Sequence, residues 1–188
     1  MSSSFVSSFV SGFGVALAET GQALQRTGLR LKGLRAVEPS KFVTVGSRWA
    51  VPLVCNSAQV SHDATVLGAV MIGDDTKVGA GSVLRGDVYS VVVNQFATVG
   101  DNCIVSATEK QTEQGLPEAC VLNSGASLGD GVIVTMSVIG DDVTVGDNSI
   151  IINSWIQNGA TILPNTTIPS GSKIPAGETW GGNPAQRQ

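Results

Sequence analysis

The sequence has 188 residues, of which 42% are hydrophobic and 14% charged, with 11 Lys and Arg against 15 Asp and Glu. This length fits one domain, or one domain with a short appendage, and the hydrophobic content excludes wholesale disorder. The net charge of −4 argues against a nucleic-acid partner, which needs clustered Lys and Arg, and the single histidine, His62, excludes a zinc site that takes two or three imidazoles from one chain.

The N-terminal segment, 1–38, differs from the rest of the chain in charge and periodicity. Residues 1–41 contain five Lys and Arg against two Glu, a balance of +3, whereas the remaining chain balances at −7. At helical spacing one face of this segment is apolar. That face comprises Val6, Val10, Phe13, Leu17, Leu24 and Leu31, with Arg26 and Arg30 near the opposite face. We predict an amphipathic N-terminal helix and linker over residues 1–38.

Two roles are open for this helix. It contains no run of about 18 apolar residues, so it should not span a membrane. Its apolar face and basic residues favour docking on membrane surface lipid or on a partner protein. The alternative is that the helix only covers one end of the body.

From residue 54 onward, an aliphatic residue recurs at about every sixth position. The series is Val54, Val60, Val66, Ile72, Val78, Leu84, Val93, Val99, Val105, Leu122, Leu128, Val134, Ile139, Val145, Ile151, Ile156, Ile162, Ile168 and Ile174. Three hexads make one triangular coil, with coils about 4.8 Å apart and each aliphatic above its counterpart three hexads away. We therefore predict an all-β fold for residues 39–188, a left-handed parallel β-helix of hexapeptide repeats.

The repeat breaks twice. Its register slips within 83–93, and it disappears in the polar stretch 106–121. Insertions in repeat proteins project from one face and often carry function. We predict that 106–121 is a loop that leaves the prism, either to contact a partner or to shield a neighbouring surface.

Three stretches carry a family resemblance: TGQALQRTGLRLKG at 20–33, GSVLRGDV at 81–88 and IPAGETWGGNPAQ at 174–186. With them the chain resembles the γ-class carbonic anhydrases, specifically those found as subunits of mitochondrial respiratory complex I in plants, algae and some protists. The hexads alone would also admit acyltransferases, but VLRGD and WGGNPA are typical of the γ-anhydrase branch.

The resemblance also shows what is missing. The family's three zinc histidines would fall at Ser106, Asp130 and Thr135, and a glutamine that orients the catalytic water would fall at Gly100. In this family the metal lies between subunits of a trimer. The resemblance therefore implies no zinc and no cofactor in this chain, with zinc possible only between ligand-bearing partner subunits, and a protein that is not an enzyme.

Several other residues have alternative interpretations of their role. Arg85, Asp87 and Asp101 match the family and are expected to brace a corner or a subunit interface, although a retained anion or bicarbonate site is the alternative. His62 should face outward as a surface residue, or else serve as the base of an acyltransferase. Cys55, Cys103 and Cys120 form no CxxC pair and are expected to be packed thiols.

The resemblance implies a non-catalytic accessory subunit of mitochondrial NADH:ubiquinone oxidoreductase (complex I). Such a subunit would form a trimer with related γ-anhydrase subunits, peripheral on the matrix side of the inner membrane. It would contact membrane-arm subunits and contribute to assembly or stability. The alternatives are an active γ-carbonic anhydrase and, from a different class, a hexapeptide acyltransferase.

Overall fold

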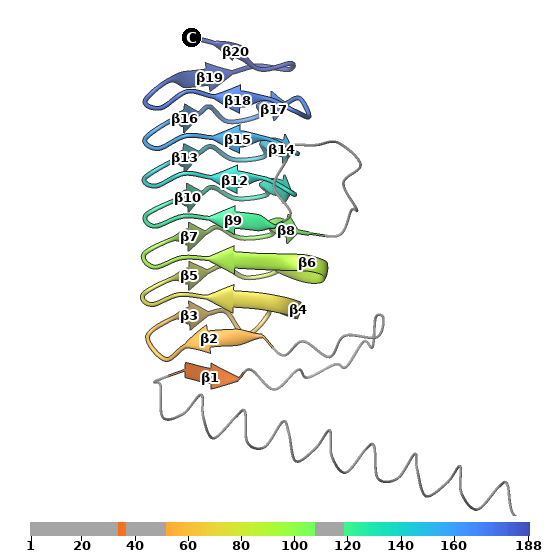
Figure 1. The fold of residues 1–188 in the computed structure, drawn as a ribbon, viewed down its shortest axis with the longest axis vertical. Coiled ribbons are helices and arrows are strands. Elements are labelled where there is room, and N and C mark those ends of the chain that lie inside the picture. The colour runs from red at the N-terminus through yellow and green to blue at the C-terminus, as the bar shows by residue number, and fades with distance from the viewer. Residues whose placement is uncertain (1–33, 37–51, 108–118) are drawn as a thin grey trace, which may run out of the picture.

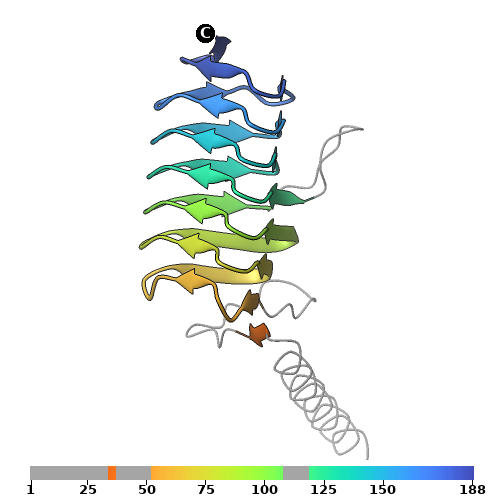
Figure 2. The same cartoon turned by 90° about the vertical axis from the view of Figure 1, so that its left-hand side faces the viewer.

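A computed structural model describes residues 34–36, 52–107 and 119–188. Over these residues the chain winds into stacked triangular coils of short parallel strands, the left-handed β-helix that the hexads predict (Figure 1). Figure 2 shows the same coils stacked one above another along the long axis. The predicted N-terminal helix, with its apolar and basic faces, lies outside the described residues. Within the described ranges, no helix is both long and apolar enough to cross a membrane.

The described strands are β1 (Leu34–Ala36), β2 (Leu53–Cys55), β3 (Gln59–Val60), β4 (Thr65–Ile72), β5 (Lys77–Val78), β6 (Val83–Val93), β7 (Thr98–Val99), β8 (Ile104–Ser106), β9 (Cys120–Leu122), β10 (Ser127–Leu128), β11 (Ile133–Thr135), β12 (Val138–Ile139), β13 (Thr144–Val145), β14 (Ile150–Ile152), β15 (Trp155–Ile156), β16 (Thr161–Ile162), β17 (Thr167–Ile168), β18 (Lys173–Ile174), β19 (Thr179–Gly181) and β20 (Gln186–Arg187).

These strands make three faces. The first face contains β2, β9, β12, β15, β18 and the second halves of β4 and β6. The second face contains β3, β5, β7, β10, β13, β16 and β19, and the third contains β8, β11, β14, β17 and the first halves of β4 and β6. We call the corner between the first and second faces the first edge, that between the second and third the second edge, and that between the third and first the third edge.

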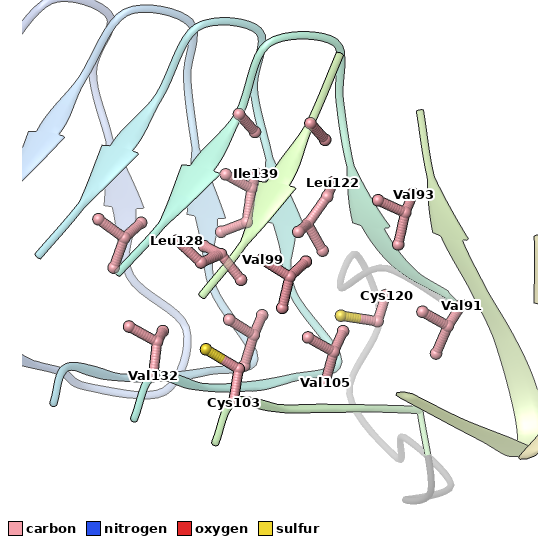
Figure 3. Close-up of a cluster of buried hydrophobic side chains, with 14 of the residues drawn as sticks. Val91, Val93, Val99, Cys103, Val105, Cys120, Leu122, Leu128, Val132 and Ile139 are labelled. Carbon is pink, nitrogen blue, oxygen red and sulfur yellow. The ribbon is translucent and has the colours of Figure 1, made fainter. Parts of the chain in front are cut away.

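The predicted aliphatic series forms the core. Nearly all of its members are buried, and Val60 and Val66 are partly buried and pack against the others. The parallel register places Val99, Leu128 and Val145 above one another on the second face. Figure 3 shows Val99 and Leu128 within the cluster of buried side chains that fills the space between the faces. Burial of this continuous stack is what holds short strands in place.

The predicted spacing of three hexads between stacked aliphatics holds only for some coils. Ile72 stacks on Val54 at that spacing, but the coil from Ile72 to Val93 is longer. The coil from Val93 to Leu122 contains the predicted loop and is longer still, whereas the coil from Leu122 to Ile139 falls just short of three hexads. All these differences arise at the third edge, because the first and second edges keep the hexad spacing between inward aliphatics in every coil.

The two ends of the predicted loop segment adjoin this third edge. Ser106 is the last residue of β8, and Cys120 and Val121 belong to β9, so both ends of the predicted 106–121 segment lie within the prism. Residues 108–118 lie outside the described ranges.

Additional strands cover both ends of the β-helix. β1, which falls inside the segment predicted as helix and linker, pairs antiparallel with β2. At the other end β20 pairs antiparallel with β19, where Arg187 forms an ion pair with Glu178 (Nη1–Oε1 3.0 Å) and Trp180 donates to the same carboxylate. Strand edges covered in this way are less available for aggregation.

Candidate functional site

Two of the three degenerate zinc positions are neighbours on the third face. Ser106 ends β8 and Thr135 ends β11, and the parallel register places them side by side. Their hydroxyl oxygens lie 3.1 Å apart in a hydrogen bond. Ser106 is buried, with 8% exposure, and Thr135 is partly buried. One of the two hydroxyls therefore donates to the other.

The third position, Asp130, has a different environment at the second edge. Its Oδ1 accepts the backbone N–H of Asp101 (2.8 Å), and its own N–H donates to Asp147 (3.0 Å). One coil earlier, Asp101 accepts the N–H of Ala80 in the same way (2.7 Å). Asp130 is thus one step of a carboxylate ladder that pairs corner N–H groups of successive coils.

The three positions do not form a zinc site within one chain. Asp130 precedes β11 and Thr135 ends it, so they lie at opposite edges of the third face. Zinc sites are built from thiolate, imidazole and carboxylate ligands, and two of these positions offer only neutral hydroxyls. No group of three or more His, Cys, Asp or Glu among the described residues is arranged to hold a metal ion. The residues present do not fit zinc.

The structure explains why residue 100 is glycine. A Cβ atom at Gly100 would lie 2.6 Å from Asp130 Oδ1 and 2.6 Å from the carbonyl oxygen of Gly129. The corner of the next coil therefore leaves no room for a side chain. The glutamine of the resembling family would need a shift of backbone as well as of Asp130.

An open trough of about 390 Å³ runs along the second face beside this ladder. Lys77, Asp101 and Asp130 are its charged lining residues, and Gly79 and Gly100 contribute backbone. Its lining contains no histidine and no thiol.

Arg85 and Asp87 lie near the hydroxyl pair. Arg85 is in register with Ser106 on the third face, and its Nε donates to Asp87 Oδ2. The Asp87 side chain is only 7% exposed, whereas that of Arg85 is 47% exposed. Arg85 therefore neutralises a buried carboxylate. Asp101, which is also expected to brace a corner or a subunit interface, lies at the second edge, where it accepts the N–H of Ala80.

His62 and the cysteines lack the setting of catalytic groups. His62 is fully exposed, and its imidazole has one described partner, Asp63, at 3.5 Å. The Cys103 thiol donates to the Gly129 carbonyl (3.0 Å), and burial raises its pKa. Burial also raises the pKa of Cys120 to about 12, while at Cys55 burial and then Asp74 raise the pKa. Raised thiol pKa values oppose nucleophilic reactivity.

Sequence reasoning missed the outward-facing side of the strands. Outward side chains on two faces form apolar columns in register: Leu53, Met71, Val92, Val121, Val138 and Trp155 on the first face, and Val83, Ile104, Ile133 and Ile150 on the third. The matching column on the second face is polar: Gln59, Lys77, Thr98, Ser127, Thr144, Thr161 and Thr179. The sequence does contain a sign of these outward columns: unbroken apolar runs such as CIV and III are typical of strands that are covered on both faces.

Comparisons with known proteins agree with this architecture. No family model matches the chain. Two mitochondrial proteins of Arabidopsis thaliana are similar: gamma carbonic anhydrase 1, 29% identical over 177 residues (92% of this chain, 64% of that protein), and gamma carbonic anhydrase 2, 30% identical over 171 residues (89% and 61%). The chain thus spans a little under two thirds of these relatives.

Among solved structures, a hexapeptide transferase family protein from Anaplasma phagocytophilum has a TM-score of 0.67 and 25% identity, covering 74% of this chain and 78% of its own. An N-acyltransferase from Bacillus cereus, AntD, has a TM-score of 0.62 at 14% identity, covers 72% of this chain and 82% of its own, and shows the fold alone. The chain is therefore similar to these mitochondrial gamma carbonic anhydrases over about nine tenths of its own length, and it has the left-handed β-helix fold of the hexapeptide transferase family protein.

Proposed function

We propose that this protein is a non-catalytic accessory subunit of mitochondrial complex I, which forms a trimer with related γ-carbonic-anhydrase-like subunits on the matrix side of the membrane arm. Its contribution is to assembly and stability of the complex. The observation that carries the proposal is the arrangement of the three positions that the resemblance assigns to zinc ligands. Ser106 and Thr135 form a hydrogen bond with one another, and Asp130 accepts a backbone N–H of the preceding coil.

This state argues against the active γ-carbonic anhydrase. Hydration of CO₂ in that class needs a Lewis acid that lowers the pKa of bound water to near 7. Within one chain, the described residues offer no group of ligands for such a metal ion. The acyltransferase alternative gains only the fold from the structural comparisons, and fully exposed His62 gives it no site.

The outward apolar columns support a role in assembly. Met71 and Trp155 on the first face are 48% and 42% exposed, and Ile104 on the third is 42% exposed. Contiguous exposed apolar surface on a folded protein marks an interaction site. In our proposal related subunits cover the third face, with Arg85 and Asp87 within the contact and Asp101 at its margin.

The mitochondrial location rests on the relatives, which are named as mitochondrial proteins. In our proposal the N-terminal segment anchors the trimer through its apolar residues, with Arg26 and Arg30 near lipid headgroups. Each basic residue near an anionic surface would add about 1 kcal/mol to binding.

The test is to isolate the affinity-tagged full chain from mitochondria of the organism that makes it. We expect co-migration with complex I on native gels, with related γ-carbonic-anhydrase-like chains identified by mass spectrometry. The tagged chain expressed alone should neither bind zinc stoichiometrically nor hydrate CO₂ in a stopped-flow assay. Zinc near one per chain with hydration activity would overturn the non-catalytic assignment, and a soluble monomer in mitochondria would overturn the structural one.

A further inference from the structure

The first edge carries an unusual residue. At each of six successive turns, on the left in Figure 1, one residue has the left-handed backbone conformation. These residues are Asp75, Phe96, Gly125, Asp142, Gly159 and Gly177, with φ between 53° and 71°. The backbone N–H of Phe96 donates to the Asp74 carbonyl, as the later members donate to the preceding coil. Phe96 is the only bulky side chain in this column.

Nothing inside the prism accounts for the phenylalanine. A bulky residue at φ 59° is strained by contact of its Cβ with the backbone, which glycine avoids and aspartate tolerates. Core packing does not offset this strain, because Phe96 is 59% exposed, the most exposed large hydrophobic residue described. Strain retained at a surface position points to function.

The surroundings of Phe96 are acidic. Asp75 lies one coil below Phe96, and Gly125 lies one coil above it. Asp142 Oδ1 occupies the space that a Cβ atom at position 125 would take. Neither Asp75 nor Asp142 forms an ion pair with a described residue. Their neighbours Asp74 and Asp141 are used internally, accepting from Ser57 and from the Ser124 N–H. Phe96 is thus displayed between two carboxylates that lack a described cation.

We propose that the first edge around Phe96 is a docking site for a basic protein surface, in which an apolar pocket rimmed by Arg or Lys receives the ring. A guanidinium can stack on the ring while pairing with a carboxylate beside it. The same carboxylates repel nucleic acid and anionic lipid, so the occupant is a protein. The site is separate from the assembly contact proposed above, because the first edge lies opposite the third face.

A photo-crosslinking phenylalanine at position 96 tests this in the full-length chain, in its native mitochondria. The crosslinked peptide should come from another protein and contain Lys or Arg beside apolar residues. Its yield should fall several-fold in the D75N/D142N background and at high salt. Crosslinks only within the chain or to lipid, or a yield indifferent to the two charges, would contradict the proposal.

A crosslinker at Ile104 on the third face is the matched control. A crosslink from position 104 reports the proposed contact of the third face with related subunits. The third-face contact and the first-edge contact can therefore be confirmed or contradicted independently. A stability measurement separates docking from a structural role for the ring. Phe96→Asn should leave the Tm unchanged or raise it, while abolishing co-isolation of the protein crosslinked at position 96. A fall in Tm of more than about 4 °C would make Phe96 a structural residue and overturn the proposal.

Discussion

Asp130, which the resemblance aligns with a zinc ligand, has a structural role in this chain. The carboxylate accepts a backbone N–H at a corner where the strand ladder cannot supply a carbonyl. Asp101 and Asp147 do the same in the adjacent coils. An aspartate at position 130 therefore extends a pattern that the fold already uses, and a histidine would interrupt it.

This role predicts a difference between two substitutions. Asp130→Ala leaves the Asp101 N–H without its acceptor and should lower the free energy of unfolding by about 1 kcal/mol. Asp130→Asn keeps an oxygen at the same position and should cost less than half of that. Urea denaturation of both variants measures the difference. Equal losses would mean that the hydrogen bond does not explain the residue.

The buried thiol of Cys120 predicts a dependence of stability on pH. Burial raises its pKa from the usual 9.0 to about 12 in the folded state. Between these values the unfolded chain has lost the thiol proton and the folded chain has not. The free energy of unfolding should therefore fall with rising pH, by about 1.4 kcal/mol per unit from this group.

Other groups titrate in the same range, so the comparison is with Cys120→Ala. Urea denaturation at pH 8, 9.5 and 10.5 should show a shallower decline in the variant, whatever its stability at pH 8. Parallel declines in the two proteins would show that Cys120 ionises equally in both states.

At the scale of elements, every departure from six-residue spacing between inward aliphatics occurs at the third edge. Between β11 and β12 the corner from the inward Val134 to the inward Ile139 is shorter than a hexad, and Met136 closes it at φ 48°. Unlike Phe96, Met136 is completely buried. The backbone strain at Met136 is therefore offset by packing of its side chain in the core.

Glycine should therefore have different effects at the two positions. Met136→Gly relieves about 1–2 kcal/mol of backbone strain but removes a buried side chain worth about 2–5 kcal/mol, so a net loss of roughly 1–3 kcal/mol is expected. Phe96→Gly relieves similar strain and uncovers little core, while the greater freedom of glycine in the unfolded chain costs about 0.5–1 kcal/mol, so the stability should stay within about 1 kcal/mol of the parent. Chemical denaturation measures both. A larger loss for Phe96→Gly than for Met136→Gly would contradict this account.

The sequence predicted the elements better than their spacing. Inward aliphatics were identifiable because the hexad period follows from the triangular coil, and all of them lie in or against the core. The shortened coils were not foreseen, because a corner can lose one residue when Met136 or Asn153 takes a left-handed conformation. Glycine favours this conformation and asparagine tolerates it, but a methionine such as Met136 gives no sign of it.

The candidate site was only partly predictable for a similar reason. Ser106 and Thr135 could be placed by resemblance, but their mutual hydrogen bond depends on register across a loop of unpredictable length. The carboxylate ladder through Asp130 depends on which corner residues stack, and this too follows from register. The strain at Phe96 is a property of the backbone that no residue pattern predicts.

For the whole molecule, the faces divide the surface by polarity. The third face presents Val83, Ile104, Ile133 and Ile150 outward, whereas the second presents a column of hydroxyls around Thr144. Contacts between neighbouring coils partly bury Val83, Ile133 and Ile150, and Ile104 stays 42% exposed. The remaining exposed apolar surface of this column gains free energy when another surface covers it.

A charge placed on each face tests this division. Ile104→Lys should leave the isolated chain as stable as the parent, since the Ile104 side chain is 42% exposed. The same substitution should prevent the chain from joining the complex I assembly proposed above. Thr144→Lys places the same charge on the exposed second face and should assemble normally. Native gels of mitochondria that express each tagged variant give the comparison, with thermal denaturation as the control for folding. Assembly of Ile104→Lys at the parental level would show that the third face stays in water, and the apolar columns would then need an explanation other than a partner.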